Sequence, residues 1–433
     1  WTRLTSICLK LTDGTHHSPD SFPTGEYKYV TAKNIKLNGI VLDDITYVTA
    51  EVHREIFARC NPEIGDILYI KDGATSGIAT VNTLYEEFSL LSSVALLKPA
   101  HGINNWYMCY AMQSPYFYST TRGDMKGVGI TRITLNMLAS RLIPVPPQNE
   151  QQRISVKSRE EIDLISSIES DKGNIVRMVS QIKSKILDLA IRGKLVLQDP
   201  NDEPASVLLE RIRAEKEELI KQGKIKRDKK ESVIFKGEDN SYYLRTGRVE
   251  ESLEDWRFDD LPKTWKICCL GELCDYGDCI NVNTEDIAED AWILDLEDIE
   301  KDTGTVLKKV TKDQRNSVST KHKFHSGQVL YSKLRPYLNK VVLSDADGYC
   351  TSEILPLEFK NCVLPEYARY YLMSGTFITY ANHCSYGVKM PRLGTTDGKK
   401  AIFSLPPLSE QKRIVETIDF CFMQLNKISE ALA

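Results

Sequence analysis

The stretch PPQNEQQRI, Pro146–Ile154, has a close copy, PPLSEQKRI, at Pro406–Ile414, 260 residues further along the chain. In each copy a double proline, which cannot lie inside a helix, is followed by a polar residue and a glutamate. Such residues favour the first turn of a helix, because they cap free backbone N–H groups and oppose the helix dipole. We therefore expect Asn149 and Ser409 to cap two helices. The repeated helix start indicates that one structural unit occurs twice.

The repeat extends upstream of the prolines. The first copy contains WYMCYAMQSPYF and KGVGITRI where the second contains EYARYYLMSGTF and YGVKMPRL. Residues that match at the same spacing are Tyr107 and Tyr367, Tyr110 and Tyr370, Ser114 and Ser374, Phe117 and Phe377, and Arg132 and Arg392. Further upstream, GDILYIKDG at 65–73 pairs with GQVLYSKLR at 327–335 after a small shift, as loop insertions produce. This ordered series indicates a tandem duplication of one unit.

Each unit is expected to be a β-rich domain followed by a helix, which gives the chain an α+β fold. Short runs rich in Val, Ile, Tyr and Thr alternate with turn residues and predict strands of a twisted sheet. In the first unit these runs are EYKYVTA, GIVLDDITYVT, DILYIKDG and SSVALLKP. Helical spacing of apolar residues predicts short helices near 105–114 and 366–374. The expected β-rich domains are residues 1–147 and 263–407.

Residues 148–192 and 408–433 are expected to be the two helices. In the first, Ile175, Val179, Ile182, Ile186 and Leu189 recur at the 4-3-4-3 spacing of a coiled-coil seam. A helix from 150 to 191 is about 60 Å long at about 1.5 Å per residue, more than one small domain needs for packing. We expect the two helices to pack on each other. The second is about half as long as the first, so we expect it to be truncated.

Residues 193–262 form a highly charged connection between the units. A helix is expected over 204–222, entered through Asp202 and Pro204 and stopped at Gly223. The run KIKRDKK follows at 224–230, and five of its seven residues are basic. The sequence leaves two interpretations open for this run, contact with phosphates and a solvated linker.

Composition excludes several classes of protein. The chain has 56 Lys and Arg against 60 Asp and Glu, a net charge of −4, which by itself names no partner. Its 11 cysteines are scattered without a CxxC pair and indicate reduced thiols. No apolar run approaches the roughly 20 residues of a membrane span, so we expect no membrane contact and a cytoplasmic location.

Motifs for catalysis are missing or weak. The double prolines lack the Asp or Asn and the aromatic residue that an adenine methyltransferase places around them, and the phosphate-binding GxxxxGK[ST] loop is absent. Asp20, Glu26 and Lys28 match a nuclease-like PD…ExK pattern, but at very short spacing and in one unit only. The histidines at 16–17 and at 322 and 325 lack ligands at metal-site spacing. We therefore expect no catalytic residue and no metal site.

Several segments together resemble the specificity (S) subunit of type I restriction-modification systems. They are PPQNEQQRI, TDGTHHSPDSFPTGEYKYVTAKNI, SKILDLAIRGKLVLQDPNDEPASVLLERIRAEKEELIKQGKIKRDKK, LPKTWKICCLGEL and LPPLSEQKRIVETI. The resemblance covers essentially the whole chain, in the order recognition domain, helix, recognition domain, helix. It implies that each β-rich unit is a target recognition domain that reads one half of a split double-stranded DNA sequence. It also implies that the helices pair as an antiparallel coiled coil between the halves.

The resemblance implies partners as well. Two methyltransferase (M) subunits would dock on the helices, and restriction-translocase (R) subunits would attach through the M subunits. S-adenosylmethionine, ATP and Mg would then belong to the partner subunits, and this chain would need no cofactor. Because the chain is weakly acidic, the M subunits are expected to supply much of the surface that neutralises DNA phosphates.

Candidate DNA contacts follow from what base reading requires, namely exposed polar or basic side chains on loops carried by a sheet. They are Thr15, His16, Lys33, Asn34, Lys71, Ser76, Lys126 and Arg132 in the first unit, and Lys333, Arg335, Tyr337, Tyr386, Lys389 and Arg392 in the second. For Arg132 and Arg392, an ion pair within their own domain is equally compatible with the sequence. Two other functions remain open: a coiled-coil scaffold that binds protein, and a nuclease that uses the PD…ExK pattern.

Overall fold

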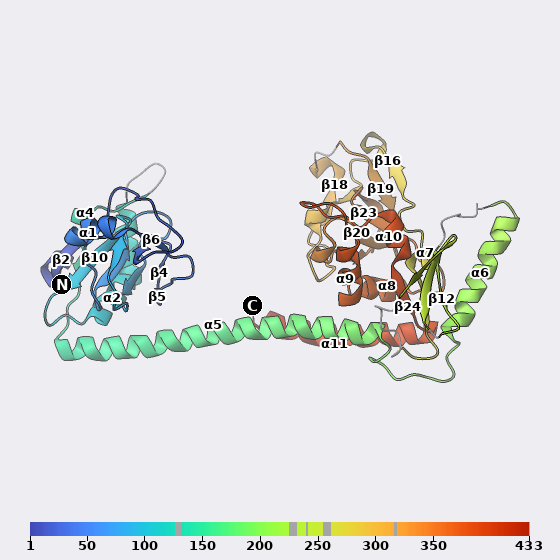
Figure 1. Cartoon of the computed structure of the whole chain (residues 1–433), viewed down its shortest axis with the longest axis horizontal. Coiled ribbons are helices and arrows are strands. Elements are labelled where there is room, and N and C mark those ends of the chain that lie inside the picture. The colour runs from blue at the N-terminus through green and yellow to red at the C-terminus, as the bar shows by residue number, and fades with distance from the viewer. Residues whose placement is uncertain (126–130, 225–231, 240, 254–260, 316–317, 433) are drawn as a thin grey trace. The chain divides into compact units, whose positions relative to one another are not determined.

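The computed structural model describes residues 1–125, 131–224, 232–239, 241–253, 261–315 and 318–432. They form two compact units, Trp1–Asp171 and Lys172–Ala433 (Figure 1). Both units mix helices with short strands, as the sequence predicts. Within the described ranges, no helix is both long and apolar enough to cross a membrane.

A four-stranded antiparallel sheet lies at the centre of the first unit. Its order is β2 (Cys8–Asp13), β10 (Val94–Pro99), β7 (Ile67–Ile70) and β8 (Ala79–Val81). Both faces of this sheet are covered, because the alternating residues of β7 enter two different cores. Ile67 and Tyr69 pack towards helices α2 (Asn105–Gln113) and α3 (Pro115–Gly123). Leu68 and Ile70 pack towards a second sheet.

That second sheet has the order β6 (Thr46–Val48), β3 (Tyr27–Val30) and β9 (Phe88–Leu90). Helix α1 (Ala50–Arg59) follows β6 and was not predicted from the sequence, whereas the four strand runs and α2 were. Smaller elements complete the unit: β1 (Thr2–Arg3) pairs with β11 (Leu142–Ile143), β4 (Ile35–Lys36) pairs with β5 (Gly39–Ile40), and α4 (Leu135–Ala139) precedes β11.

The second unit repeats the central part of this arrangement. Strands β21 (Val341–Leu343), β20 (Val329–Ser332) and β23 (Ile354–Leu357) pair in the order of β8, β7 and β10. The helices that correspond to α2, α3 and α4 are α8 (Pro365–Leu372), α9 (Gly375–His383) and α10 (Thr395–Lys400). Strand β15 (Lys266–Cys269) pairs with β24 (Ile402–Leu405) as β1 pairs with β11, and the short helix α7 (Leu270–Leu273) follows β15.

The sheet next to this shared part is larger in the second unit. The second unit carries five short strands there, in the order β16 (Ile280–Val282), β19 (Lys321–Phe324), β22 (Gly348–Thr351), β17 (Trp292–Leu294) and β18 (Val310–Thr311). Their core contains Trp292, Leu294, Phe324 and Cys350. Strands β22, β17 and β18 pair in the order and directions of β9, β3 and β6. The repeat therefore includes this sheet, to which the second unit adds β16 and β19.

The charged connection is more structured than expected from the sequence. Helix α6 (Ala205–Lys221) agrees with the predicted 204–222. The prediction missed a three-stranded sheet, β12 (Ser232–Lys236), β13 (Tyr242–Thr246) and β14 (Val249–Ser252). Ile234 and Leu244 of this sheet pack against Ile267 and Ile402, so the connection is part of the second unit. Apart from Lys224, the KIKRDKK run lies outside the described residues.

Helices α5 (Gln148–Ile191) and α11 (Leu408–Leu432) follow the two double prolines. The predicted caps were wrong, because the helices begin at residues 148 and 408, before Asn149 and Ser409. Asn149 and Ser409 lie inside the first turn, and the carbonyls of Pro147 and Pro407 accept the first helical hydrogen bonds, from the N–H of residues 151 and 411 at 3.0 and 2.9 Å.

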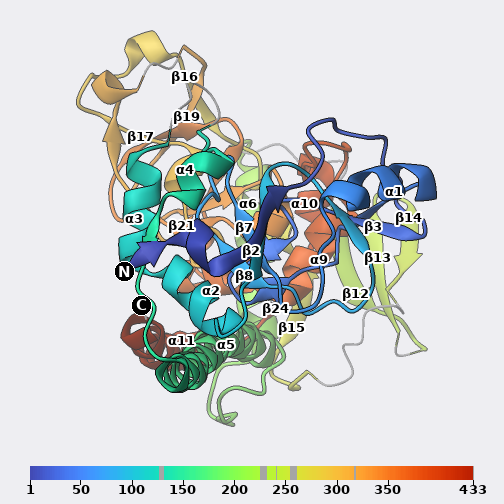
Figure 2. The same ribbon diagram turned by 90° about the vertical axis from the view of Figure 1, so that its left-hand side faces the viewer.

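The end of α5 runs beside α11 in the second unit (Figure 1 and Figure 2). Lys183 Nζ lies 2.6 Å from Asn426 Oδ1, and Ser404 Oγ donates to the carbonyl of Ile191 at 2.8 Å. These contacts pair increasing residue numbers in α5 with decreasing numbers in and before α11, so the helices are antiparallel where they touch. Of the expected seam, Val179 is buried, whereas Ile175 and Ile182 are 38% and 43% exposed.

A buried glutamine fixes the start of each helix to its domain. Gln151 donates to the carbonyls of Pro146 (2.9 Å) and Gly102 (3.4 Å) and accepts from the N–H of Asn104 (2.8 Å). Gln411 forms the same set with Pro406 (3.0 Å), Cys362 (2.8 Å) and Leu364 (2.8 Å). Each glutamine therefore joins the proline turn to the backbone that enters α2 or α8.

The residue before Gln411 adds a second connection in the second unit. Glu410 is buried and accepts hydrogen bonds from Trp265 Nε1 at 2.9 Å and Gln198 Nε2 at 2.5 Å. Burial raises the pKa of the Glu410 carboxyl. One turn later, Arg413 pairs with Asp202 at 2.6 Å, so Asp202, which precedes α6 as expected, contacts α11. The connection between the units is thereby held against α11.

Replacing Gln411 with leucine should destabilise the second unit. The substitution leaves two carbonyls and one N–H buried without partners, at about 1–3 kcal/mol each before relaxation, so we expect a loss of about 3 kcal/mol. Urea unfolding followed by tryptophan fluorescence measures it. Gln424→Leu, at an exposed position of the same helix, is the matched control and should change the free energy of unfolding by less than about 0.5 kcal/mol. Equal effects of the two variants would contradict the structural role of Gln411.

Candidate nucleic-acid interface

The predicted contacts after β7 and after β20 lie on the same backbone arrangement. In the first unit the N–H of Lys71 donates to the carbonyl of Ser93 at 2.9 Å, and the N–H of Ile133 donates to the carbonyl of Lys71 at 3.0 Å. In the second unit the N–H of Lys333 donates to the carbonyl of Glu353 at 3.0 Å, and the N–H of Leu393 donates to the carbonyl of Lys333 at 3.0 Å. Two loops that are distant in sequence thus meet in the same way in both units.

We call this arrangement the loop junction. It comprises residues 71–73 with 131–133 in the first unit and 333–335 with 391–393 in the second. At its centre, Asp72 pairs with Arg132 in an isolated antiparallel bridge, and Leu334 pairs with Arg392. The loop junction brings together Lys71 and Arg132 in the first unit, and the predicted residues between 333 and 337 with those between 386 and 392 in the second.

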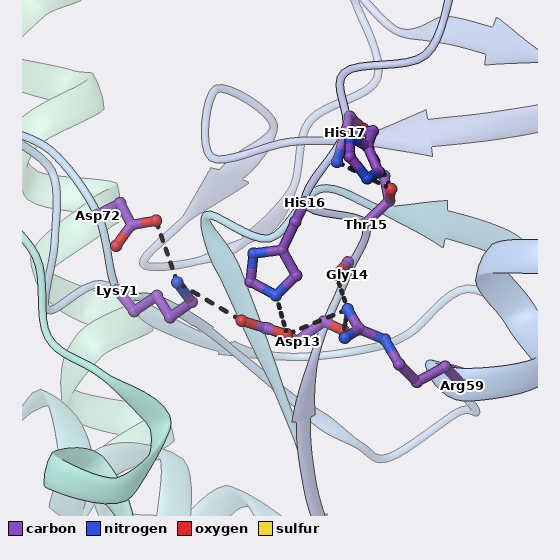
Figure 3. A network of polar contacts seen from close by, with 8 residues as sticks. All are labelled: Asp13, Gly14, Thr15, His16, His17, Arg59, Lys71 and Asp72. Atoms are coloured by element: carbon purple, nitrogen blue, oxygen red, sulfur yellow. Dashed lines mark hydrogen bonds and ion pairs between the residues drawn. The ribbon is translucent and has the colours of Figure 1, made fainter.

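In the first unit the loop junction is joined to a buried carboxylate. Figure 3 shows His16, Arg59 and Lys71 directed at Asp13, which ends β2. The distances to the Asp13 carboxylate oxygens are 3.3 Å from His16 Nε2, 3.2 Å from Arg59 Nη2 and 3.5 Å from Lys71 Nζ. Lys71 also lies 3.1 Å from Asp72 Oδ2. Lys71 is 7% exposed, so its charge is used inside the domain.

Gly14 lets the chain turn at this point. A Cβ on Gly14 would lie 1.9 Å from the carbonyl oxygen of Leu90, so no other residue fits without moving the backbone. The N–H of Thr15 donates to that same carbonyl at 2.8 Å. Arg59 Nη2 holds the other side of the turn through the carbonyls of Asp13, at 3.0 Å, and of Gly14. The TDGTHH stretch is therefore a fixed turn that exposes His16 and His17.

Two other predicted contacts are also internal. Asn34 is 6% exposed, accepts from the N–H of Thr31 at 3.0 Å and donates to the carbonyl of Val41 at 3.1 Å. Ser76 is 2% exposed, and its hydroxyl lies 3.3 Å from the sulfur of Met125. Their side chains stabilise loops of the domain and are not available to a ligand in this structure.

The remaining predictions for the first unit differ in exposure. Lys33 and Arg132 are exposed. Thr15 is half-buried, and its hydroxyl donates to the carbonyl of His17 at 3.1 Å. Lys126 lies outside the described residues.

The second unit presents its candidates on two neighbouring loops. Tyr386 and Arg392 exchange backbone hydrogen bonds of 3.1 and 2.9 Å, which closes a loop whose tip includes Lys389. Tyr386 and Tyr337 are 62% and 51% exposed, and Lys389 is exposed. Arg335 has the left-handed conformation, with φ of 51°, which non-glycine residues rarely adopt. It starts the short turn that carries Tyr337. Lys333 is half-buried.

Arg392 forms an ion pair within its own domain. Its Nη2 lies 2.8 Å from Glu353 Oε1 and its Nε lies 3.0 Å from Oε2, while Nη1 donates to the carbonyl of Met390 at 3.2 Å. Hydrogen bonding to Glu353 raises the pKa of the Arg392 guanidinium. Of the two interpretations that the sequence left open for Arg392, the structure favours the internal ion pair. Neither Glu353 nor Arg59 was predicted as a site residue, although Glu353 takes the position of Ser93 in the repeat.

The residues suspected of catalysis or metal binding have separate partners. Lys28 Nζ pairs at 2.7 Å with Glu86, a residue that is not part of the PD…ExK pattern. His322 Nδ1 lies 2.8 Å from the carbonyl of Ile354, and burial lowers the pKa of His322. His325 pairs with Glu358. Across the described part of the chain, no group of three or more His, Cys, Asp or Glu is placed to hold a metal ion.

Comparison with known proteins supports the resemblance that the motifs indicated. Residues 262–431 match the family described as "Type I restriction modification DNA specificity domain". The chain is 27% identical over 383 residues to the type I restriction enzyme EcoAI specificity subunit of Escherichia coli, covering 75% of this chain and 61% of that protein. It is 23% identical over 337 residues to the EcoDI specificity subunit of Escherichia coli, covering 74% and 65%. The chain therefore spans less than two thirds of the length of these relatives.

Structural comparison agrees in fold. A chain from a solved structure of a type I R-M system, described for its complex assembly and conformational transition, aligns with a TM-score of 0.60 and 16% identity. The alignment covers 100% of this chain and 92% of the other. Sequence and fold together confirm the resemblance to type I specificity subunits.

Replacing Asp13 with asparagine should destabilise the first unit. The change removes the charge that Lys71 and Arg59 share, and loss of one partner from a buried pair costs about 3 kcal/mol. Hydrogen exchange of the β2 and β7 amides measures the effect in the full chain. Asp20→Asn, at an exposed position in the same loop, is the control and should leave the exchange rates unchanged. Unchanged protection in Asp13→Asn would contradict the role assigned to this carboxylate.

Proposed function

We propose that this chain is the DNA sequence-specificity subunit of a type I restriction-modification complex, and that each unit reads one half of a bipartite DNA target. The observation that carries the proposal is the match of residues 262–431 to a DNA specificity domain, together with the same loop junction in the first unit. Two domains with one backbone plan suit two half-sites. Because their exposed side chains differ, the two half-sites differ in sequence and the target is asymmetric.

The exposed residues around each loop junction are the proposed DNA contacts. In the first unit these are Lys33 and Arg132, with Lys126 still a prediction; in the second they are Tyr337, Tyr386 and Lys389. Basic side chains neutralise phosphates, and tyrosine hydroxyls donate to phosphates or base edges. Thr15 and His16, in the turn after β2, are proposed to contact DNA at the edge of the first unit's interface. Lys333 and Arg335 are proposed to support the loops of the second.

Helices α5 and α11 are proposed to pair as an antiparallel coiled coil on which two M subunits dock, with R subunits attached through them. Apolar side chains exposed on α5 support this: Leu164 (55%), Ile165 (54%), Ile168 (59%) and Met178 (57%). A soluble helix rarely leaves such a series in water unless a partner covers it. In this proposal the chain itself is non-catalytic, and S-adenosylmethionine, ATP and Mg bind the partner subunits. The complex works in the cytoplasm.

Adenine-methylation mapping tests the proposal in cells that contain the methyltransferase subunits with or without this chain. We expect one split motif to be methylated only when the chain is present. Unchanged methylation would contradict the proposal and favour a coiled-coil scaffold that binds protein. Magnesium-dependent cleavage of DNA by the purified chain, abolished by Glu26→Ala, would instead favour a nuclease.

Exchange of residues 1–145 for the matching domain of a second specificity subunit tests the division of labour. The exchange should change the bases of one half of the methylated motif and leave the bases of the other half unchanged. A change in both halves would contradict the assignment of one unit to each half-site.

A further inference from the structure

One position of the loop junction carries different chemistry in the two units. The carbonyl that accepts from Lys71 belongs to Ser93, and the carbonyl that accepts from Lys333 belongs to Glu353. Strands β10 and β23 begin immediately after these two residues, at Val94 and Ile354. Ser93 and Glu353 therefore occupy equivalent backbone positions beside the arginine of each loop junction.

In the second unit, Glu353 neutralises that arginine. Arg392 Nε and Nη2 both donate to the carboxylate, with the shortest distance 2.8 Å between Nη2 and Oε1. A two-point contact of this kind fixes the plane of the guanidinium as well as its position. Nη1 is directed at the carbonyl of Met390, inside the same loop. The guanidinium thus holds the loop that carries Tyr386 and Lys389.

In the first unit, serine cannot play this part. The Ser93 hydroxyl is buried and has no hydrogen-bond partner among the described residues. Asp72 faces Arg132 across the bridge, but its Oδ2 atom lies 3.1 Å from Lys71 Nζ. Lys71 Nζ also forms an ion pair with Asp13. Within the part of the chain that the structure describes, the exposed Arg132 side chain makes no ion pair or hydrogen bond. Arg132 therefore keeps a full, solvent-facing charge.

We propose that the residue at this position sets the role of the arginine in each unit. With Ser93, Arg132 is a direct DNA contact; with Glu353, Arg392 is a positioning residue that shapes the loop bearing Tyr386 and Lys389. This inference rests on the proposed function and deepens it, because it assigns different means of recognition to two units with one backbone plan. The first half-site would be held through arginine charge, and the second through the shaped loop.

The test uses the full chain in complex with its methyltransferase subunits and a duplex that carries the methylated motif. Ser93→Glu should reproduce the Glu353 ion pair and weaken binding about tenfold, the loss expected when one arginine contact is removed. Ser93→Gln has nearly the same shape without the charge and should bind within about twofold of the wild type. Arg132→Ala should match Ser93→Glu, and the double variant should lose no more than either single variant, because both remove one interaction.

The reciprocal change gives a readout that a loss of stability would not produce. Glu353→Ser should free Arg392, make binding at low salt several-fold tighter and steepen its salt dependence, because one more cation can reach a phosphate. Thermal unfolding of each variant shows whether it is folded. If Glu353→Ser is not folded, the same binding measurements are made with Glu353→Gln.

Three results would overturn the inference: equal binding by Ser93→Glu and Ser93→Gln, wild-type binding by Arg132→Ala, or unchanged salt dependence in both Glu353 variants. Failure of the proposed function is distinct from these. It would appear as a wild-type complex that binds the motif no better than a shuffled duplex.

Discussion

The rest of the structure depends on a buried glutamine at the fourth position of each long helix. Gln151 and Gln411 each satisfy two carbonyls and one N–H where the proline turn, the domain and the helix meet. Buried backbone groups need partners, and a side chain with both a donor and an acceptor at this depth meets the need in both copies. The direction in which each helix leaves its domain is set by these bonds. The repeated sequence PPxxEQ therefore forms a rigid junction between domain and helix, in addition to starting the helix.

Duplication has kept backbone contacts and allowed side chains to diverge. The loop junction uses the same N–H and carbonyl groups in both units, so it does not depend on which side chains it carries. Its side chains are free to differ, as at Ser93 and Glu353, and the first unit adds the Asp13 network to its own copy. A scaffold fixed by backbone hydrogen bonds can present new recognition surfaces without refolding. This property suits the proposed recognition of two unlike half-sites.

The sequence was most informative where the signal is local or repeated. The strand runs, α2, α8 and the long helices follow from residue periodicity, and the resemblance to specificity subunits follows from several long motifs. The three-stranded sheet after α6 was missed because the charged residues around Ile234 and Leu244 conceal a short alternating pattern.

The site was harder to predict than the fold. Lys71, Asn34 and Ser76 are polar residues on loops, and nothing local shows that distant partners bury them. The partner of Lys71, Asp13, lies in another strand, and Arg59 reaches the same carboxylate from helix α1, which the sequence did not reveal. The helix caps were also predicted wrongly, since Asn149 and Ser409 lie inside the first turn of helices that begin at residues 148 and 408. Long-range contacts of this kind require the structure.

Each unit is proposed to place its loop junction on a different half of one DNA target. A photo-cross-linking amino acid placed at Thr131 or at Tyr386, both exposed, tests it most directly in the full complex bound to the methylated motif. Sequencing of the cross-linked bases should place the Thr131 adduct in one half-site and the Tyr386 adduct in the other, with none in the spacer. Adducts from both positions in the same half-site, or adducts equally frequent on a shuffled duplex, would contradict the account.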